Sequence, residues 1–149
     1  MCTTGLAPLD TTKAVKCYKS VAKLKDGTLV AIIPHLRKSK EQFVYKNGKN
    51  TKVGNIGLHT YVNQDLAEKL CEVVASMEKN TKDTESYIVL NATIPPRTKA
   101  EVGYWQVEGQ DAYVSDDLVI DAKNVLAEYP VKKNRKLFQK LTRELHIID

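Results

Sequence analysis

One change in the spacing of apolar residues, at Asn63, limits what this 149-residue chain can fold into. Before Asn63, apolar and polar residues alternate in short runs, which is the spacing of half-buried β-strands. After it, the apolar residues recur at the spacing of a single helical face, at Leu66, Leu70, Val73, Val74 and Met77. This spacing therefore predicts strands before Asn63 and an amphipathic helix after it.

Two hairpins are predicted in the strand-forming part. Apolar and polar residues alternate on both sides of Asp26-Gly27, a dipeptide that tolerates the positive φ values of a tight turn. A second hairpin is expected around Asn47-Gly48, between residues 43–45 and residues 53–56. Four early strands follow from these two turns, after an irregular arm over residues 1–12.

The helix is predicted to start at Asn63, whose side chain can cap it, and to end near residues 79–80. The next segment, SYIVLNATI (residues 86–94), is β-branched and apolar enough for a buried strand, and Pro95-Pro96 ends it. Further strands are expected over residues 99–107 and 117–121.

The last segment, residues 131–149, is predicted to be a basic amphipathic helix. Leu137, Leu141 and Leu145 recur at helical spacing, while lysines and arginines occupy the opposite side. The order of elements predicts one α+β domain over residues 1–149, with a mainly antiparallel sheet, one central helix and this C-terminal helix.

Composition argues against a disulfide-stabilised, metal-binding or membrane protein. Three widely spaced cysteines and three scattered histidines indicate neither a disulfide framework nor a metal site, and no motif for a bound cofactor occurs. No long apolar run or export signal is present, so we expect no membrane contact and a cytoplasmic location. The net charge of +5 is concentrated in the tail, where residues 123–149 hold seven Lys or Arg against three acids.

The order of short motifs resembles a family of small proteins from phages and gut bacteria such as Bacteroides. Its members start with Met-Cys and carry a CYK strand, a Gly-x-His segment, an IP-x-x-T stretch and an AS-x-x-I end. The matching segments here are MCTTG, VKCYKS, GLHTY, ATIPPRT and AYVSDDLVI, over about residues 1–121. This resemblance implies an origin in a phage or mobile element, and it implies no activity.

The same order is also distantly similar to the ADP-ribosyltransferase fold. That resemblance places Lys19 at the position that holds the dinucleotide and the His59-Thr60-Tyr61 block beside the nicotinamide pocket. It places the segment Asp111–Asp117, with Asp116, where the catalytic acid stands. Lys19 lacks the planar fork of Arg, and Asp116 is one methylene shorter than Glu.

Residue chemistry indicates an anionic ligand near the start of the central helix. Free backbone N–H groups at Asn63 and the partial positive charge of the helix suit a phosphate, and His59 or Tyr61 can stack on a base. Arg97, stiffened by the two prolines before it, can be aimed at the same phosphate. The structural alternative is that Gly57 makes a turn, His59 is an ordinary strand residue and Tyr61 packs on the helix.

Three functional hypotheses follow. The first is a non-enzymatic protein that binds a phosphate-bearing nucleotide or an ADP-ribose-like ligand through Lys19, His59, Tyr61, Asn63, Arg97 and Asp116, and so sequesters a host immune signal. The second is an active ADP-ribosyltransferase. The third is a nucleic-acid-binding or virion-associated structural protein that uses its basic C-terminal helix. A homo-oligomer is a further expectation, because a sheet of this size leaves an edge or a face to cover.

Overall fold

The computed structural model describes residues 4–36, 43–104 and 111–145. The strands in chain order are β1 (Thr4–Pro8), β2 (Val15–Leu24), β3 (Leu29–Val30), β4 (Val44–Tyr45), β5 (Gly48–Thr51), β6 (Leu58–Tyr61), β7 (Thr84–Ile94), β8 (Ala100–Tyr104), β9 (Ala112–Ser115) and β10 (Asp117–Pro130). The helices are α1 (Ile32–Leu36), α2 (Gln64–Ala75) and α3 (Arg135–Leu145). This confirms an α+β domain built on a mostly antiparallel sheet.

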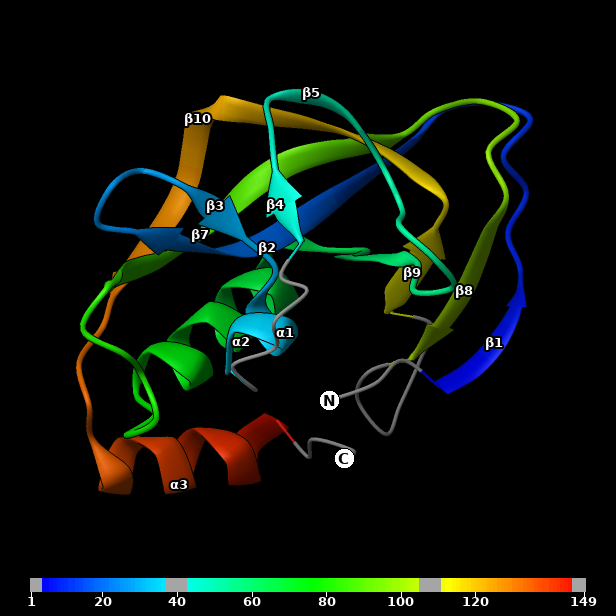
Figure 1. Cartoon of the computed structure of the whole chain (residues 1–149). Helices are drawn as coiled ribbons and strands as arrows, with labels where there is room; N and C mark the ends of the chain where they lie inside the picture. Colours follow the sequence, from blue (N-terminus) through cyan, green and yellow to red (C-terminus); the bar gives the residue numbers. More distant parts are fainter. Residues whose placement is uncertain (1–3, 37–42, 105–110, 146–149) are drawn as a thin grey trace.

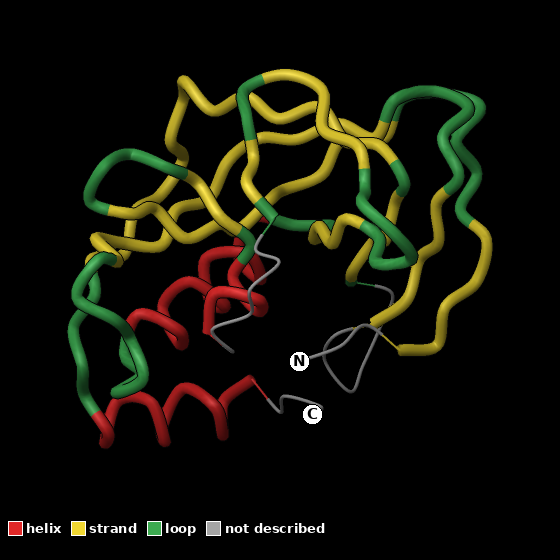
Figure 2. The backbone as a smooth tube through the Cα atoms, in the orientation of Figure 1, coloured by secondary structure: helices red, strands yellow, loops and turns green. Residues whose placement is uncertain are grey.

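The strands form one sheet in the order β1-β8-β9-β6-β2-β7-β10-β5, with β3 and β4 attached beside β2. Every pairing among the described strands is antiparallel. Only Asp116 separates β9 from β10, yet β9 pairs with β6 and β8 while β10 pairs with β7 and β5. One continuous chain segment therefore joins two distant places in the strand order, and the sheet curls into a partial barrel (Figure 2).

The curled sheet has a core on each face. On its inner face, alternate residues of β2 and β7 bury Cys17, Val21, Ile88 and Leu90. On its outer face, the intervening residues pack against α2, and α3 lies below α2 (Figure 1). Because successive side chains of a strand point to opposite faces, the continuous apolar run of β7 serves both cores.

The first hairpin is confirmed and the second is wrong. β2 pairs with β3 across a turn in which Gly27 has a φ of 89°. Asn47-Gly48 also makes a turn, with a φ of 95° at Gly48, but β4 pairs with β3 while β5 pairs with β10. The side chain of Asn47 accepts a hydrogen bond from the N–H of Ala122, at 2.8 Å, so the turn is attached to β10.

The two predicted helices form, each over a shorter range. The apolar stripe of α2 is buried as expected, and the helix ends at Ser76 rather than near residue 80. The C-terminal helix occupies Arg135–Leu145 and buries Leu141 and Leu145; the residues after 145 lie outside the described range.

The sequence patterns missed two features near the ends of the sheet. Within the arm predicted to be irregular, Thr4–Pro8 forms the edge strand β1, which is held by backbone pairing with β8 although Leu6 is exposed. The strand predicted over residues 117–121 continues to Pro130, through a bulge after Asp121. Tertiary pairing decides both of these segments, because their own apolar patterns are weak.

The N-cap of α2 gives a first testable prediction. Asn63 has extended backbone, and its side-chain oxygen accepts the N–H of Leu66 at 2.9 Å. Asn63→Ala is expected to lower the free energy of unfolding by about 1 kcal/mol, because it leaves this N–H without its acceptor. Urea denaturation measures the loss. Asn63→Asp keeps the acceptor and should stay close to the wild type; an equal loss in both variants would contradict the capping role.

Candidate anion-binding site

The candidate site lies where β2 and β6 separate. These two strands pair at Tyr18 and Tyr61, so the next residues in each direction, Lys19 and Thr60, face one another on the inner side of the sheet. Alternation along β2 places Lys19 between Cys17 and Val21, both of which are completely buried in the inner core. The alternation along β2 predicts an apolar residue at this buried position, and the sequence has a lysine there.

Lys19 is buried, and no negatively charged side chain in the described ranges pairs with it. The residue is 6% exposed. Its Nζ donates a hydrogen bond to the carbonyl oxygen of His59 at 2.5 Å and lies 4.8 Å from the ring centroid of Tyr45. In the described part of the chain, no carboxylate forms an ion pair with it. A buried ammonium group of this kind attracts any anion that can reach it.

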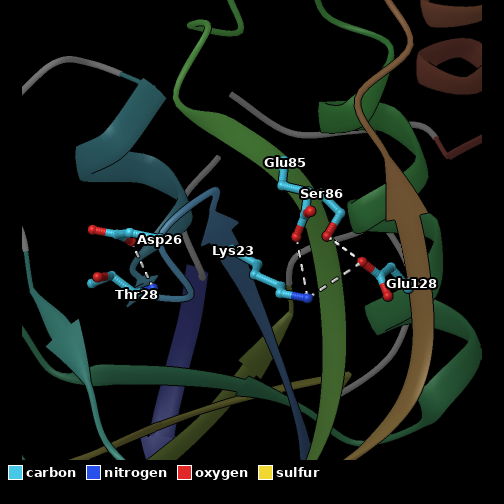
Figure 3. A network of polar contacts seen from close by, with 6 residues as sticks. All are labelled: Lys23, Asp26, Thr28, Glu85, Ser86 and Glu128. Atoms are coloured by element: carbon cyan, nitrogen blue, oxygen red, sulfur yellow. Dashed lines mark hydrogen bonds and ion pairs between the residues drawn. The ribbon is translucent and has the colours of Figure 1, made fainter.

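Lys23, on the same face of β2, shows the more usual arrangement, in which carboxylates pair with the ammonium group. Its Nζ lies 3.2 Å from a carboxylate oxygen of Glu85 and 3.9 Å from one of Glu128, which also accepts a hydrogen bond from Ser86 at 2.6 Å (Figure 3). This lysine is partly exposed and neutralised. Of these two lysines, Lys23 has carboxylate partners, whereas Lys19 has none among the described residues.

Two buried hydroxyl groups lie on the inner face, that of Thr60 on β6 and that of Ser115 on β9. The oxygens of Thr60 and Ser115 have no hydrogen-bond partner among the described residues, although the two side chains are 0% and 1% exposed. Ser115 is opposite Leu58, so it lies diagonally across from Thr60 on the adjacent strand. Buried polar groups are normally hydrogen-bonded, so both hydroxyls are unusual; the Thr60 hydroxyl lies close enough to the Cys17 thiol to lower its pKa, although no hydrogen bond of ordinary geometry joins them.

The thiol of Cys17 lies in the same inner core and is buried. Burial raises the pKa of its thiol to about 11, although the neighbouring Thr60 hydroxyl and the Lys19 ammonium both act to lower it. Cys71 is buried as well, and its pKa is raised to about 12. Both described thiols therefore stay protonated near neutral pH.

His59 contributes its backbone carbonyl and carries no charge. Its Nδ1 donates a hydrogen bond to the carbonyl of Gly57 at 3.1 Å. Burial and the positive charge of Lys19 lower the pKa of the ring to about 4. The imidazole is therefore neutral at physiological pH, and it cannot supply positive charge to an anion.

The low pKa of His59 predicts a pH dependence of stability. The unfolded chain binds a proton at this ring with a pKa near 6.5, while the folded chain does so only near 4. The stability that His59 contributes is complete above about pH 6.5 and is lost as the pH falls towards 4. His59→Gln should flatten the loss between these values by about 2 kcal/mol, measured by denaturant unfolding at several pH values. Parallel curves for the two proteins would refute the assignment.

The other predicted site residues do not join Lys19 and His59. Tyr61 lies in the core against α2, and burial raises the pKa of its phenol well above the ordinary value. The side chain of Asn63 caps its own helix. Arg97 is exposed in a turn with a φ of 63°, and its N–H donates to the carbonyl of Thr11. Asp116 pairs with Lys52 at 3.0 Å.

The phosphate position predicted at the start of the central helix stays a prediction; of the residues named for it, Lys19 and His59 meet through a hydrogen bond, and the side chain of Asn63 caps its own helix. There is also a structural reason for a glycine at position 57. A Cβ there would lie 2.3 Å from Cγ1 of Val114 on the neighbouring strand. Tyr61 packs in the core with α2, whereas Gly57 lies just before β6, outside the turn at Gly54 and without a positive φ. The sequence patterns did not identify Thr60 or Ser115, whose inward orientation appears only once the register of β6 and β9 is known.

A second charged surface lies on α3. This helix buries Leu141 and Leu145, and the cations on and before it are exposed: Lys132, Lys133, Arg135, Lys136, Lys140 and Arg143. Two of them have acidic neighbours, Arg135 with Glu78 at 3.7 Å and Lys140 with Glu144 at 4.0 Å. The remaining cations form a largely uncompensated basic face.

Comparison of the chain with protein-family models, with curated proteins and with solved structures finds no match. The resemblances to short phage proteins and to ADP-ribosyltransferases therefore stay predictions. Within residues 4–36, 43–104 and 111–145, no group of three or more metal-binding side chains occurs. No helix in these ranges is long and apolar enough to span a membrane.

Proposed function

We propose that this chain is a small non-enzymatic protein that binds a phosphate-bearing ligand, a nucleotide or an ADP-ribose-like molecule, with Lys19 as the cation that neutralises it. The observation that carries the proposal is the buried ammonium group, which has no carboxylate partner among the described residues. Removing a charge from water is costly unless it is paired, so a position of this kind in a small fold suggests a missing counter-ion.

The neighbouring groups suit binding better than catalysis. The thiol of Cys17 stays protonated, the imidazole of His59 is neutral with its Nδ1 engaged, and Asp116 is held by Lys52. No described acid or base with a pKa near neutrality lies beside Lys19 to activate a nucleophile. In the cytoplasm of a bacterial host, such a protein would sequester a nucleotide immune signal, in keeping with its resemblance to short phage proteins.

Isothermal titration calorimetry tests this proposal. The probes are ADP-ribose, cyclic ADP-ribose isomers, cyclic oligonucleotides and inorganic phosphate, each titrated into the purified chain. Saturable heat with at least one organic phosphate supports the proposal, and flat traces for all of them end it. Labelled NAD with host lysate is included because covalent labelling of a target protein would favour the ADP-ribosyltransferase alternative.

The basic face of α3 supports a second candidate function, binding of nucleic acid. Its exposed cations can neutralise phosphates along a backbone, and such binding weakens steeply as salt rises. Lys136→Glu, Lys140→Glu and Arg143→Glu together should abolish retention of RNA or DNA at low salt while leaving the buried face of the helix intact. Retention that is absent in the wild type, or that does not depend on salt, would exclude this function.

A further inference from the structure

Helix α2 covers only part of the outer face of the sheet, and the polarity of β7 changes where the helix stops. Tyr87 and Val89 face α2 and are completely buried. The next residues on the same face, Asn91 and Thr93, are polar and half-buried. In Figure 1, β5, which pairs with β10, lies at the top of the view and α3 at the bottom.

The uncovered part of the face is hollowed. Thr93 is paired with Val119 and Asn91 with Asp121, so two rows of side chains cross β7 and β10. The turn containing Asn47 forms a wall, because its side chain is bonded to the N–H of Ala122 in the bulge of β10. These residues line a shallow, solvent-open hollow with a volume of about 450 Å³.

The chemistry of the hollow differs from that of the Lys19 site. Val119 is 39% exposed and supplies an apolar surface. Within the described residues, the side chains of Asn91 and Thr93 make no hydrogen bond, so an amide and a hydroxyl are available as donors and acceptors. The carboxylate of Asp121 is fixed by the N–H of Lys123 at 3.2 Å and the side chain of Asn124 at 2.8 Å, and each of its oxygens keeps a further lone pair.

We propose that this hollow binds a polyhydroxylated ring through adjacent hydroxyl groups, either as a free neutral saccharide or as the sugar of a nucleoside. Asp121 accepts from the ring hydroxyls, Asn91 and Thr93 donate to and accept from them, and Val119 packs against the apolar C–H surface of the ring. A carboxylate in the hollow repels phosphate, which separates this ligand class from the one proposed for Lys19.

The two sites are independent. Lys19 belongs to the inner face, with Cys17 and Val21, whereas Asn91 and Thr93 belong to the outer face. The ring proposal therefore does not rest on the proposed function, and either can fail without the other.

Amide chemical-shift titration in a ¹H–¹⁵N correlation spectrum tests the proposal. The probes are glucose, N-acetylglucosamine, ribose, a neutral disaccharide, adenosine and inorganic phosphate. Saturable shifts grouped at Gly48, Asn91, Thr93 and Val119 are expected with a sugar-bearing probe. Saturation by the free saccharides supports the proposal and identifies a saccharide as the source of the ring. Saturation by adenosine alone also supports it and identifies a nucleoside as the source. No saturable shift with any sugar-bearing probe, or saturation by phosphate alone, overturns it.

Variants of the hollow make the test specific. Asn91→Ala with Thr93→Ala should weaken the binding at least about tenfold, because two side-chain hydrogen bonds are lost. Asp121→Asn, which keeps the size of the side chain, provides a second variant if the first folds poorly. Asn55→Ala, in an exposed loop outside the hollow, is the matched control and should bind as the wild type. Unchanged binding in both hollow variants would overturn the proposal.

Discussion

Lys19→Met is expected to abolish binding of the phosphate-bearing ligand and to raise the free energy of unfolding by about 1–2 kcal/mol. The variant removes a charge that is 6% exposed and has no carboxylate partner among the described residues. It loses a hydrogen bond to His59 and a contact with the ring of Tyr45, but an unbranched thioether fills the same space without the cost of burying an ion. Calorimetry and denaturant unfolding measure the two effects.

Lys23→Met is the matched control for this prediction. It changes the same residue type on the same face of β2, but at a partly exposed position that Glu85 and Glu128 neutralise (Figure 3). It should leave ligand binding intact and change stability by less than about 1 kcal/mol. If Lys19→Met instead destabilised the fold as strongly as truncation of a core residue, Lys19 would be a structural residue and the binding proposal would lose its support.

Asn80→Ala is expected to cost about 3 kcal/mol of unfolding free energy, the largest loss that we predict. Asn80 is 4% exposed, and its amide nitrogen donates to the carbonyls of Val74 at 2.7 Å and Met77 at 2.8 Å. Its oxygen accepts the hydroxyl of Tyr87, which is completely buried. Alanine leaves all of these groups without their partner.

A double-mutant cycle with Tyr87→Phe checks the cause of this loss. When the phenol is already absent, Asn80→Ala leaves one buried group fewer without a partner, so its cost should fall by about 1 kcal/mol. Urea denaturation of the four proteins gives the coupling. A loss below about 1 kcal/mol for Asn80→Ala in the wild type would show that water replaces Asn80 as the partner of the Val74 and Met77 carbonyls.

The parts of the fold that could be predicted are those whose local pattern agrees with their final surroundings. The stripe from Leu66 to Val74 packs against the sheet, and Asp26-Gly27 makes the expected hairpin. Asn47-Gly48 has the same local chemistry, but its two strands find partners elsewhere in the chain. A turn dipeptide determines a local bend, whereas pairing depends on what the folded sheet offers.

The candidate site was predictable only in part, for the same reason. Lys19 and His59 were both predicted, and they do meet, but through the carbonyl of His59 and not through its ring. Thr60 and Ser115 carry no motif, and their importance comes from the register that turns their hydroxyls inward. The useful signal in the sequence was a lysine at an apolar position of an alternating strand.

The pairing of β1 with β8 and of β2 with β7 sets how quickly the protein can refold. Thr4 pairs with Tyr104 and Val15 pairs with Ile94. Each pairing closes a long loop of the chain, and the entropy of closing that loop must be lost before the pairing stabilises the fold. Proteins dominated by such non-local pairs cross their folding barrier in about milliseconds to seconds, far more slowly than helical bundles of similar length. Dilution from denaturant in a stopped-flow instrument should therefore show slow recovery of native fluorescence.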